Sequence, residues 1–340
     1  MGQIGLFDVE NKLTELSKMG DPLEKLNNSV NWKIFKPTID RVFRKERKSN
    51  AGRPPFDYVM MFKVLVLQHM YNLSDAQTQF QILDRHTFKR FLNAGDEVRI
   101  PDEKTIWLFR ETLTQAGTIK KLFDIFNREL ENAGFKAQKG QIIDASFVEV
   151  PRQRNSREEN ETIKNGDVPK AWENSPAKMR QKDTDAQWTK KNDQIHFGYK
   201  NHINVDVKNK IVREYAVSPA NVHDSQVFEE LLDSSNTKQS VWADSAYRSE
   251  ECEANLKEMG YKSQICTKGV RNKPLSDFQI RMNSKKSQVR SRVEHVFGFM
   301  KNSMGVGWLR CIGLLRAAGR IGMTNLVYNM NRYVQLLQST

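Results

Sequence analysis

The chain has 340 residues, enough for a large core in two domains or in one domain with an insertion. Its 38% hydrophobic content argues against a disordered protein, and its three widely spaced cysteines argue against a disulfide framework or a C-x-x-C zinc site. The net charge of +13, from 54 Lys and Arg against 41 Asp and Glu, points to a polyanionic partner such as nucleic acid, with a solvated basic surface as the alternative.

The first 135 residues have the apolar spacing of helices. A helix is predicted at 56–71, after the breaker G-R-P-P, and it is too short and too polar to span a bilayer. The S-x-x-Q sequence at 74–77 is a capping box that predicts the start of the next helix. Further helices are predicted at 102–115 and 119–133. Short helices joined by tight turns permit a helix-turn-helix DNA-binding module, and they also fit a plain helical bundle.

The N-terminus lacks the basic-then-apolar order of a signal peptide, because Asp8 and Glu10 come early. A protein that stays in a reducing cytoplasm is therefore expected.

The pattern changes at residue 140, where alternating and β-branched residues begin. Residues 141–150, Q-I-I-D-A-S-F-V-E-V, are predicted to form a strand. The later predicted elements are strands at 195–207, 211–217, 240–243 and 261–267 and helices at 224–232, 249–259 and 287–302. Three meandering strands followed by helix, strand, helix, strand and helix are typical of a ribonuclease-H-like α/β core.

The segment between the first two strands has a different composition. Residues 155–193 are rich in Glu, Lys, Asn and Asp and poor in apolar residues. This predicts a mobile, solvated insertion that could order on a ligand, although Trp172 and Trp188 lie within it.

Two aspartates stand where a carboxylate is unusual. Asp144 lies mid-strand after two isoleucines, where burial is costly unless a cation or hydrogen bonds compensate it. The alternative is pairing with a basic neighbour. Asp244 ends the fourth strand, and carboxyl ends of strands line the binding site in open α/β folds. The alternative for Asp244 is an N-cap of the following helix, a role that Ser245 or Ser249 could fill equally well.

Positive charge is concentrated near the C-terminus. From residue 262 onward there are 14 Lys and Arg and only two acids, a net +12. One of these acids, Glu294, lies on the predicted helix at 287–302, with Arg290 four residues before it and Lys301 seven after it. At about 100° per residue these three side chains share one stripe. The adjoining apolar stripe, which would face the sheet, consists of Val289, Val293, Val296, Phe297 and Met300.

An ion pair between residues four apart on a helix would explain why Arg290 and Glu294 occur together. It does not explain why the predicted helix at 287–302 contains no second acidic residue. Together, Asp144, Asp244 and Glu294 would supply the oxygen ligands that two Mg²⁺ ions prefer. Two such ions about 3.5–4 Å apart can activate an attacking hydroxyl and stabilise the departing oxygen of a phosphodiester.

The chain resembles the DDE transposases of bacterial insertion sequences, of the IS-four/IS-five group. The matching segments are G-R-P-P-F-D at 52–57, I-I-D-A-S-F at 142–147, H-F-G-Y-K-N-H at 196–202, A-N-V-H-D-S at 220–225, A-D-S-A-Y-R-S at 243–249 and R-x-x-x-E-x-x-x-x-x-x-K at 290–301. The resemblance spans about residues 35–330. Each motif alone is loose, but the occurrence of all of these motifs in this order is highly specific.

The resemblance implies that Asp144, Asp244 and Glu294 are the catalytic, metal-binding residues. The DNA-contacting candidates are Tyr247, Arg248, Lys285, Lys286, Arg290, Arg292 and Lys301. A tyrosine that the family often has three residues before the arginine is replaced by Ser287.

Two further residues have alternative roles. Asp224 is a rival metal ligand, although its place at a predicted helix start favours capping. Trp308 could stack on an unpaired base or pack in the core.

A bacterial transposase at the nucleoid in the cytoplasm is therefore expected. With Mg²⁺, for which Mn²⁺ may substitute, it would cut double-stranded DNA at terminal inverted repeats and join the ends to target DNA by in-line phosphoryl transfer, within a homodimer. The expected domains are a helical DNA-binding domain at 1–135, a ribonuclease-H-like catalytic domain at 136–310 and a C-terminal helical segment at 311–340. A nuclease without strand transfer and a non-catalytic DNA-binding protein derived from a transposase are the alternatives.

Overall fold

The structure, a computed structural model, describes residues 8–44, 54–95, 98–191, 193–269 and 274–339. Gly52 and Arg53 of the G-R-P-P sequence lie outside these ranges. The chain divides into two compact units, the first made of residues 1–126 and 326–340 and the second of residues 127–325. These limits differ from the domain boundaries predicted at 135 and 310.

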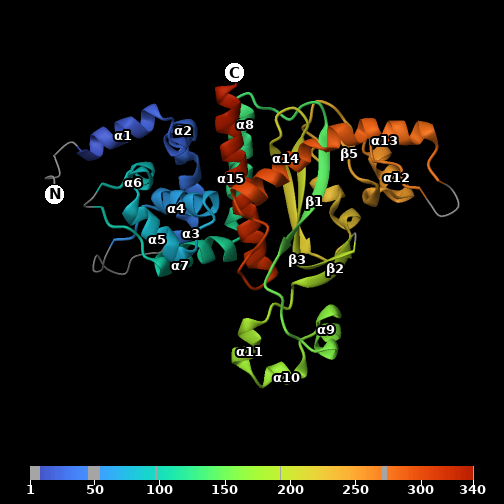
Figure 1. The fold of residues 1–340 in the computed structure, drawn as a ribbon, viewed down its shortest axis with the longest axis horizontal. Coiled ribbons are helices and arrows are strands. Elements are labelled where there is room, and N and C mark those ends of the chain that lie inside the picture. The colour runs from blue at the N-terminus through green and yellow to red at the C-terminus, as the bar shows by residue number, and fades with distance from the viewer. Residues whose placement is uncertain (1–7, 45–53, 96–97, 192, 270–273, 340) are drawn as a thin grey trace. The chain divides into compact units, whose positions relative to one another are not determined.

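The first unit is helical. Its elements are α1 (Asp8–Lys18), α2 (Pro22–Ser29), the 3₁₀ turn η1 (Trp32–Phe35), α3 (Lys36–Phe43), α4 (Tyr58–Met70), α5 (Asp75–Asp84), α6 (His86–Leu92), α7 (Glu103–Gln115) and parts of α8 (Thr118–Asn132) and α15 (Leu314–Gln338) (Figure 1). Helix α4 packs against α3, α5, α6 and α7, and its residues 60–69 are all buried. The predicted capping box of Ser74 and Gln77 begins α5. Within the described ranges, no helix is long and apolar enough to cross a bilayer.

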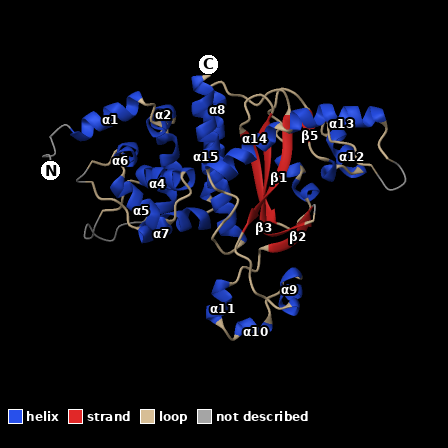
Figure 2. Ribbon diagram, viewed as in Figure 1, coloured by secondary structure: helices blue, strands red, loops and turns tan. Residues whose placement is uncertain are grey.

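The second unit is built on one mixed sheet (Figure 2). Its strands are β1 (Gln141–Glu149), β2 (Gln187–Lys191), β3 (Gln194–Asp206), β4 (Val212–Pro219), β5 (Ser240–Trp242) and β6 (Lys262–Ser263). Strands β1, β3 and β4 are antiparallel neighbours, whereas β1, β5 and β6 are parallel. The order β4-β3-β1-β5-β6 confirms the predicted ribonuclease-H-like core, and β2 adds a pairing at the start of β3.

The second unit also contains helices and turns. They are α9 (Arg157–Lys164), α10 (Lys170–Glu173), α11 (Pro176–Gln181), η2 (Asp224–Val227), η3 (Glu229–Leu231), η4 (Ser245–Tyr247), α12 (Glu250–Glu258), α13 (Asp277–Arg290), α14 (Arg292–Gly298), the π turn η5 (Phe299–Ser303) and the remaining parts of α8 and α15. Ile143 and Val148 lie five positions apart on β1, so they point to opposite faces and enter two separate buried clusters. Both faces of the sheet are therefore covered.

The predicted mobile insertion contains regular structure instead. Helices α9–α11 form a group of their own beyond one end of the sheet (Figure 1). Trp172 is fully buried among them, and its indole donates to Glu159 at 2.5 Å. Most residues of the insertion are exposed, as predicted for a solvated segment, but one tryptophan and a capping box at Ser156 organise its short helices.

Two predicted helices differ in the structure. The helix predicted at 224–232 is the pair of 3₁₀ turns η2 and η3. The helix predicted at 287–302 begins ten residues earlier, at Asp277, and is interrupted at Ser291 and again by η5. Its apolar stripe still faces inward, since Val293, Val296 and Met300 are at most 3% exposed.

Candidate active site

Asp144 and Asp244 occupy equivalent positions on neighbouring parallel strands. Ile142 of β1 pairs with Trp242 of β5, and each aspartate follows its paired residue by two positions. Neighbouring strands lie about 4.8 Å apart, so Asp144, in the middle of β1, and Asp244, just past the end of β5, lie next to each other along the backbone. The sheet therefore brings together two of the three acids that the sequence predicted to meet.

The carboxylate of Asp144 is largely buried and paired with a cation. Its side chain is 13% exposed, and Oδ2 accepts a hydrogen bond from Nη1 of Arg290 at 2.8 Å. Oδ1 accepts from the backbone N–H of Ala145 at 2.9 Å. Burial raises the pKa of Asp144, Arg290 and the Ala145 N–H oppose that shift, and the negative charge of Asp244 adds to it. The two aspartates therefore lie within electrostatic reach of each other.

Asp244 caps the 3₁₀ turn η4, whereas the following helix α12 is capped by Ser249. Oδ1 of Asp244 accepts from the N–H of Ala246 at 2.8 Å, which begins η4. Only one carboxylate oxygen takes part in this bond, and a carboxylate offers several acceptor positions. Capping and ligand binding are therefore compatible at Asp244.

Glu294 approaches this pair through Arg290. The break at Ser291 separates α13 from α14, and Glu294 lies in the first turn of α14 with its side chain 66% exposed. Nη2 of Arg290 lies 3.9 Å from Oε1 of Glu294, farther than Nη1 lies from Asp144. One guanidinium thus stands between the carboxylates of Asp144 and Glu294.

The donor chemistry of these residues suits a hard divalent cation. Carboxylate oxygens are the ligands that Mg²⁺ and Mn²⁺ accept, and Asp144 and Asp244 present them side by side. Across the described parts of the chain, no three acidic, histidine or cysteine side chains stand in a metal-binding arrangement. Arg290 provides the positive charge beside Asp144 in this arrangement. The residues therefore fit a cation, with Glu294 held apart by the guanidinium.

Asp224 has a role that the sequence did not indicate. His223, not Asp224, is the N-cap residue of η2, so the capping prediction for Asp224 is wrong. The Asp224 carboxylate instead accepts from Nζ of Lys200 at 2.7 Å, with both side chains at most 10% exposed. Sequence reasoning missed Lys200, although a lysine in the middle of a strand predicted within the core domain is the feature that could have revealed it.

Tyr247 is buried, although it was predicted as a DNA contact. The side chain is 0% exposed and joins the cluster that contains Ile143 and Ala243, the residues directly before Asp144 and Asp244. Its ring lies 5.3 Å from that of Phe228. Because adjacent residues of a strand point to opposite faces, the Tyr247 ring packs on the face of β1 opposite to the Asp144 side chain, inside the protein.

Three of the other cations predicted to contact DNA are bonded within the protein. Arg292 and Lys286 each donate to a backbone carbonyl oxygen at 2.8 Å. Arg248 bonds the hydroxyl of a threonine at 2.5 Å and lies 3.3 Å from a glutamate carboxylate. Lys285 and Lys301 are exposed, as are Arg248 and Arg292, so four of the five side chains can be reached by phosphates from solution.

Trp308 lies beside the last residue of β1. The N–H of Leu309 donates to the carbonyl oxygen of Glu149 at 2.8 Å, and the Trp308 side chain is 44% exposed. The prediction that Trp308 packs in the core is therefore wrong, and the stacking of Trp308 on an unpaired base stays a prediction.

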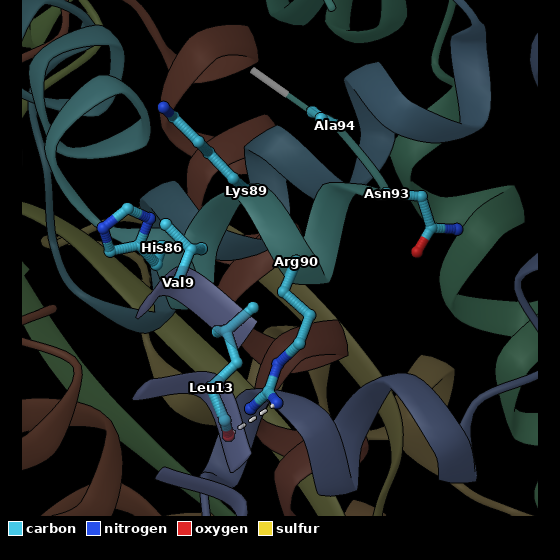
Figure 3. A pocket seen from close by; sticks show the side chains of 8 residues that line it. Val9, Leu13, His86, Lys89, Arg90, Asn93 and Ala94 are labelled. Atoms are coloured by element: carbon cyan, nitrogen blue, oxygen red, sulfur yellow. Dashed lines mark hydrogen bonds between the residues drawn. The ribbon is translucent and has the colours of Figure 1, made fainter. Parts of the chain in front are cut away.

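Two hollows accompany these features. One of about 840 Å³ in the second unit is lined by Arg248, Thr267 and Lys268, next to the turn that follows Asp244. The other, of about 330 Å³, lies in the first unit between α1 and α6, where Arg90 donates to the carbonyl oxygen of Leu13 (Figure 3). The lining of this second hollow contains no carboxylate, which makes it unsuitable for a cation.

Comparisons with known proteins identify the chain. Residues 11–112 match the family described as Transposase domain (DUF772). A solved structure of piggyBac transposase, a synaptic complex with hairpin DNA, aligns with a TM-score of 0.45 and 14% identity over 94% of this chain and 76% of that one. Residues 136–330, more than half of the chain, match the family described as Transposase DDE domain. The chain therefore belongs to the DDE transposase family.

Proposed function

We propose that Asp144, Asp244 and Glu294 are the catalytic carboxylates of this DNA transposase. Membership of the family makes the chain an enzyme that acts on DNA and depends on a divalent metal. The observation that carries the assignment is the placement of Asp144 and Asp244, each two residues beyond the Ile142–Trp242 pair on neighbouring strands. Arg290 connects Glu294 to this pair.

Each residue has a defined task in the proposed reaction. Asp144 and Asp244 hold two Mg²⁺ ions, for which Mn²⁺ can substitute, and Glu294 completes the ligand set. When bound, the cations supply charge that activates the attacking hydroxyl and stabilises the departing oxygen. Arg290 and Lys301 hold phosphate oxygens of the DNA and orient the scissile bond without reading its sequence.

The substrate is double-stranded DNA. Water attacks at the transposon end and frees a 3′ hydroxyl, which then attacks target DNA, both in line with the leaving oxygen. The helical first unit and the basic residues after 261 grip the terminal inverted repeats, and a homodimer holds two ends. We place the protein in the IS-four/IS-five group, at the nucleoid in the bacterial cytoplasm.

Substitution of the aspartates tests this assignment. Asp144→Asn and Asp244→Asn keep side-chain size but remove the charge that binds a cation. Mutation of a residue that only hydrogen-bonds a metal ligand typically lowers metal affinity or activity about 10–100-fold. We therefore expect loss of a ligand itself, in each variant, to lower Mg²⁺-dependent cleavage of a transposon end by more than about a hundredfold. Joining of a pre-cut end with a free 3′ hydroxyl should fall equally.

Asp167→Asn, at an exposed position in the insertion, is the matched control and should retain both activities. Full cleavage by a folded Asp244→Asn protein would exclude the proposed site. Cleavage without joining in the unaltered protein would favour the nuclease alternative.

A further inference from the structure

Four large apolar side chains of the first unit are exposed on two neighbouring helices. Phe80 and Leu83 of α5 are 63% and 53% exposed, and Trp107 and Leu108 of α7 are 47% and 58% exposed. Helices α5 and α7 pack against each other. Exposed apolar residues scattered singly need no explanation, whereas a group of them on packed helices marks an interaction surface.

Hydrogen bonds between the two helices show that these side chains share one surface. The N–H of Glu103 on α7 donates to Gln79 on α5 at 3.0 Å, and Arg110 on α7 bonds an aspartate of α5 at 2.8 Å. Residues three or four apart on a helix share a face. Trp107, between Glu103 and Arg110, therefore lies on the face of α7 that meets α5. Leu83, four residues after Gln79, lies on the face of α5 that meets α7.

The apolar area of this surface is large enough for the centre of a protein interface. Phe80 lies three residues before Leu83 and Leu108 follows Trp107, so both extend the surface. From their exposed fractions, the four side chains offer roughly 400 Å² of apolar area. A stable protein interface buries about 800 Å² of each partner. The four side chains alone supply about half of that area, and the polar residues around them supply the remainder.

The charge of this surface favours a copy of the same surface over DNA. Helices α5 and α7 contain four acids and two cations, a net −2 in a chain of net +13. DNA phosphates bind surfaces rich in Lys and Arg instead. Lys104 is exposed beside the exposed acids Asp84 and Glu103, so both signs of charge surround the apolar side chains. In a symmetric pair, Lys104 of one copy can face an acid of the other.

We propose that the face formed by Phe80, Leu83, Trp107 and Leu108, the α5–α7 face, binds the same face of a second copy of this chain across a twofold axis. This inference rests on the homodimer of the proposed function and names the surface that forms it. The apolar side chains form the buried centre, and their charged neighbours form the rim. Every contact in such an interface occurs twice.

A matched pair of exposed phenylalanines tests this face in the full chain. Phe80→Glu places a carboxylate in the α5–α7 face, and Phe278→Glu does so at a 67% exposed position on α13 of the second unit. Because both positions are exposed, neither change should lower the thermal midpoint by more than about 2 °C. In sedimentation without DNA, the unaltered protein and Phe278→Glu should dimerise with a Kd of about 1 µM or below. Phe80→Glu should weaken dimerisation at least about a hundredfold, since the charge is buried in both copies.

A second variant tests the charged rim without altering the apolar centre. Lys104→Glu makes the charges around the α5–α7 face predominantly acidic, so two copies repel each other. Dimerisation should weaken about tenfold at low salt and less at high salt, where surface charges are screened. Lys121→Glu, at an exposed position on α8, is the control for charge reversal and should leave dimerisation unchanged.

Three results would overturn the inference. They are an unaltered protein that stays monomeric at about 10 µM, equal dimerisation of Phe80→Glu and Phe278→Glu, and weaker binding of an end duplex by Phe80→Glu with unchanged dimerisation. The last result would show that DNA occupies the face. The catalytic assignment fails separately, because dimerisation without DNA does not depend on the proposed carboxylates. Cleavage retained by Asp144→Asn would overturn that assignment alone.

Discussion

A single guanidinium controls the electrostatics of the site. Arg290 bonds Asp144 at 2.8 Å and lies 3.9 Å from Glu294, so it neutralises the carboxylates that a cation would bind. The same guanidinium is suited to a DNA phosphate, which it binds through two parallel hydrogen bonds. Because Arg290 cannot serve both partners fully, DNA that attracts it would release Asp144 for a cation. DNA and metal binding should therefore favour each other.

Arg290→Met tests this competition at the residue scale. Loss of the guanidinium should tighten Mn²⁺ binding to the DNA-free protein about fivefold, equivalent to ~1 kcal/mol for a partly exposed pair. Binding of DNA should weaken, because a phosphate contact is lost. Arg281→Met, at an exposed position on α13, is the control for loss of one positive charge. Equal or weaker Mn²⁺ binding by Arg290→Met in a calorimetric titration would exclude the competition.

The sequence predicted these acids because each stood in an unfavourable position for a carboxylate. It could not predict that Tyr247 is enclosed or that Asp224 pairs with Lys200. Burial and pairing of those residues arise from contacts between β3, η2 and η4, which are distant in the chain. Local pattern thus predicted the acids that we propose as catalytic but not the residues that surround them.

At the scale of elements, the break between α13 and α14 sets the place of Glu294. The hydroxyl of Ser291 donates to the carbonyl oxygen of Gln288 at 3.0 Å, a backbone contact of the kind that bends helices. The early start of α13 has a local cause as well, a capping box formed by Ser276 and Gln279. The S-x-x-Q sequence at 276–279 is a local signal for this helix start, independent of the apolar pattern that predicted the helix from 287.

Helix α4 is the central element of the first unit, and it carries a buried charge. Lys63 is 5% exposed and donates to Oδ1 of Asn27 at 2.8 Å and to the carbonyl oxygen of Phe91 at 3.0 Å. Burial lowers the pKa of Lys63 from 10.5 to about 8, although Asp57 opposes the shift. Below pH 8 the protein bears the full cost of this buried ammonium.

This shift predicts how stability depends on pH. Between pH 8 and 10.5 the folded protein loses the Lys63 proton before the unfolded chain does, so stability rises with pH. Relative to Lys63→Met, the unaltered protein should gain about 2 kcal/mol of unfolding free energy between pH 7 and 9.5. Urea unfolding at both pH values measures the difference. Lys33→Met, at an exposed position, controls for charge loss, and a pH-independent difference for Lys63→Met would contradict the argument.

At the scale of the whole molecule, the strands were predictable and the insertion was not. Strands β1, β3 and β5 lie within one or two residues of their predicted limits, because their apolar patterns are strong. Helices α9–α11 have few apolar residues and depend on Trp172 with the charged partners Glu159 and Lys178. Packing around one tryptophan produces no periodic apolar pattern in the sequence, so these helices could not be predicted from such a pattern.

The uneven distribution of charge leads to a prediction for the whole chain. Residues from 262 onward contribute a net +12 of the total +13. If this segment contacts DNA phosphates, loss of one contact should reduce the magnitude of the slope of log binding constant against log salt concentration by about 0.9. Lys285→Gln and Lys301→Gln, measured by fluorescence anisotropy from about 50 to 200 mM salt, should each show this reduction for every duplex sequence. Lys257→Gln, exposed on α12 outside the segment, should not, and equal slopes in all three variants would place the DNA on another surface.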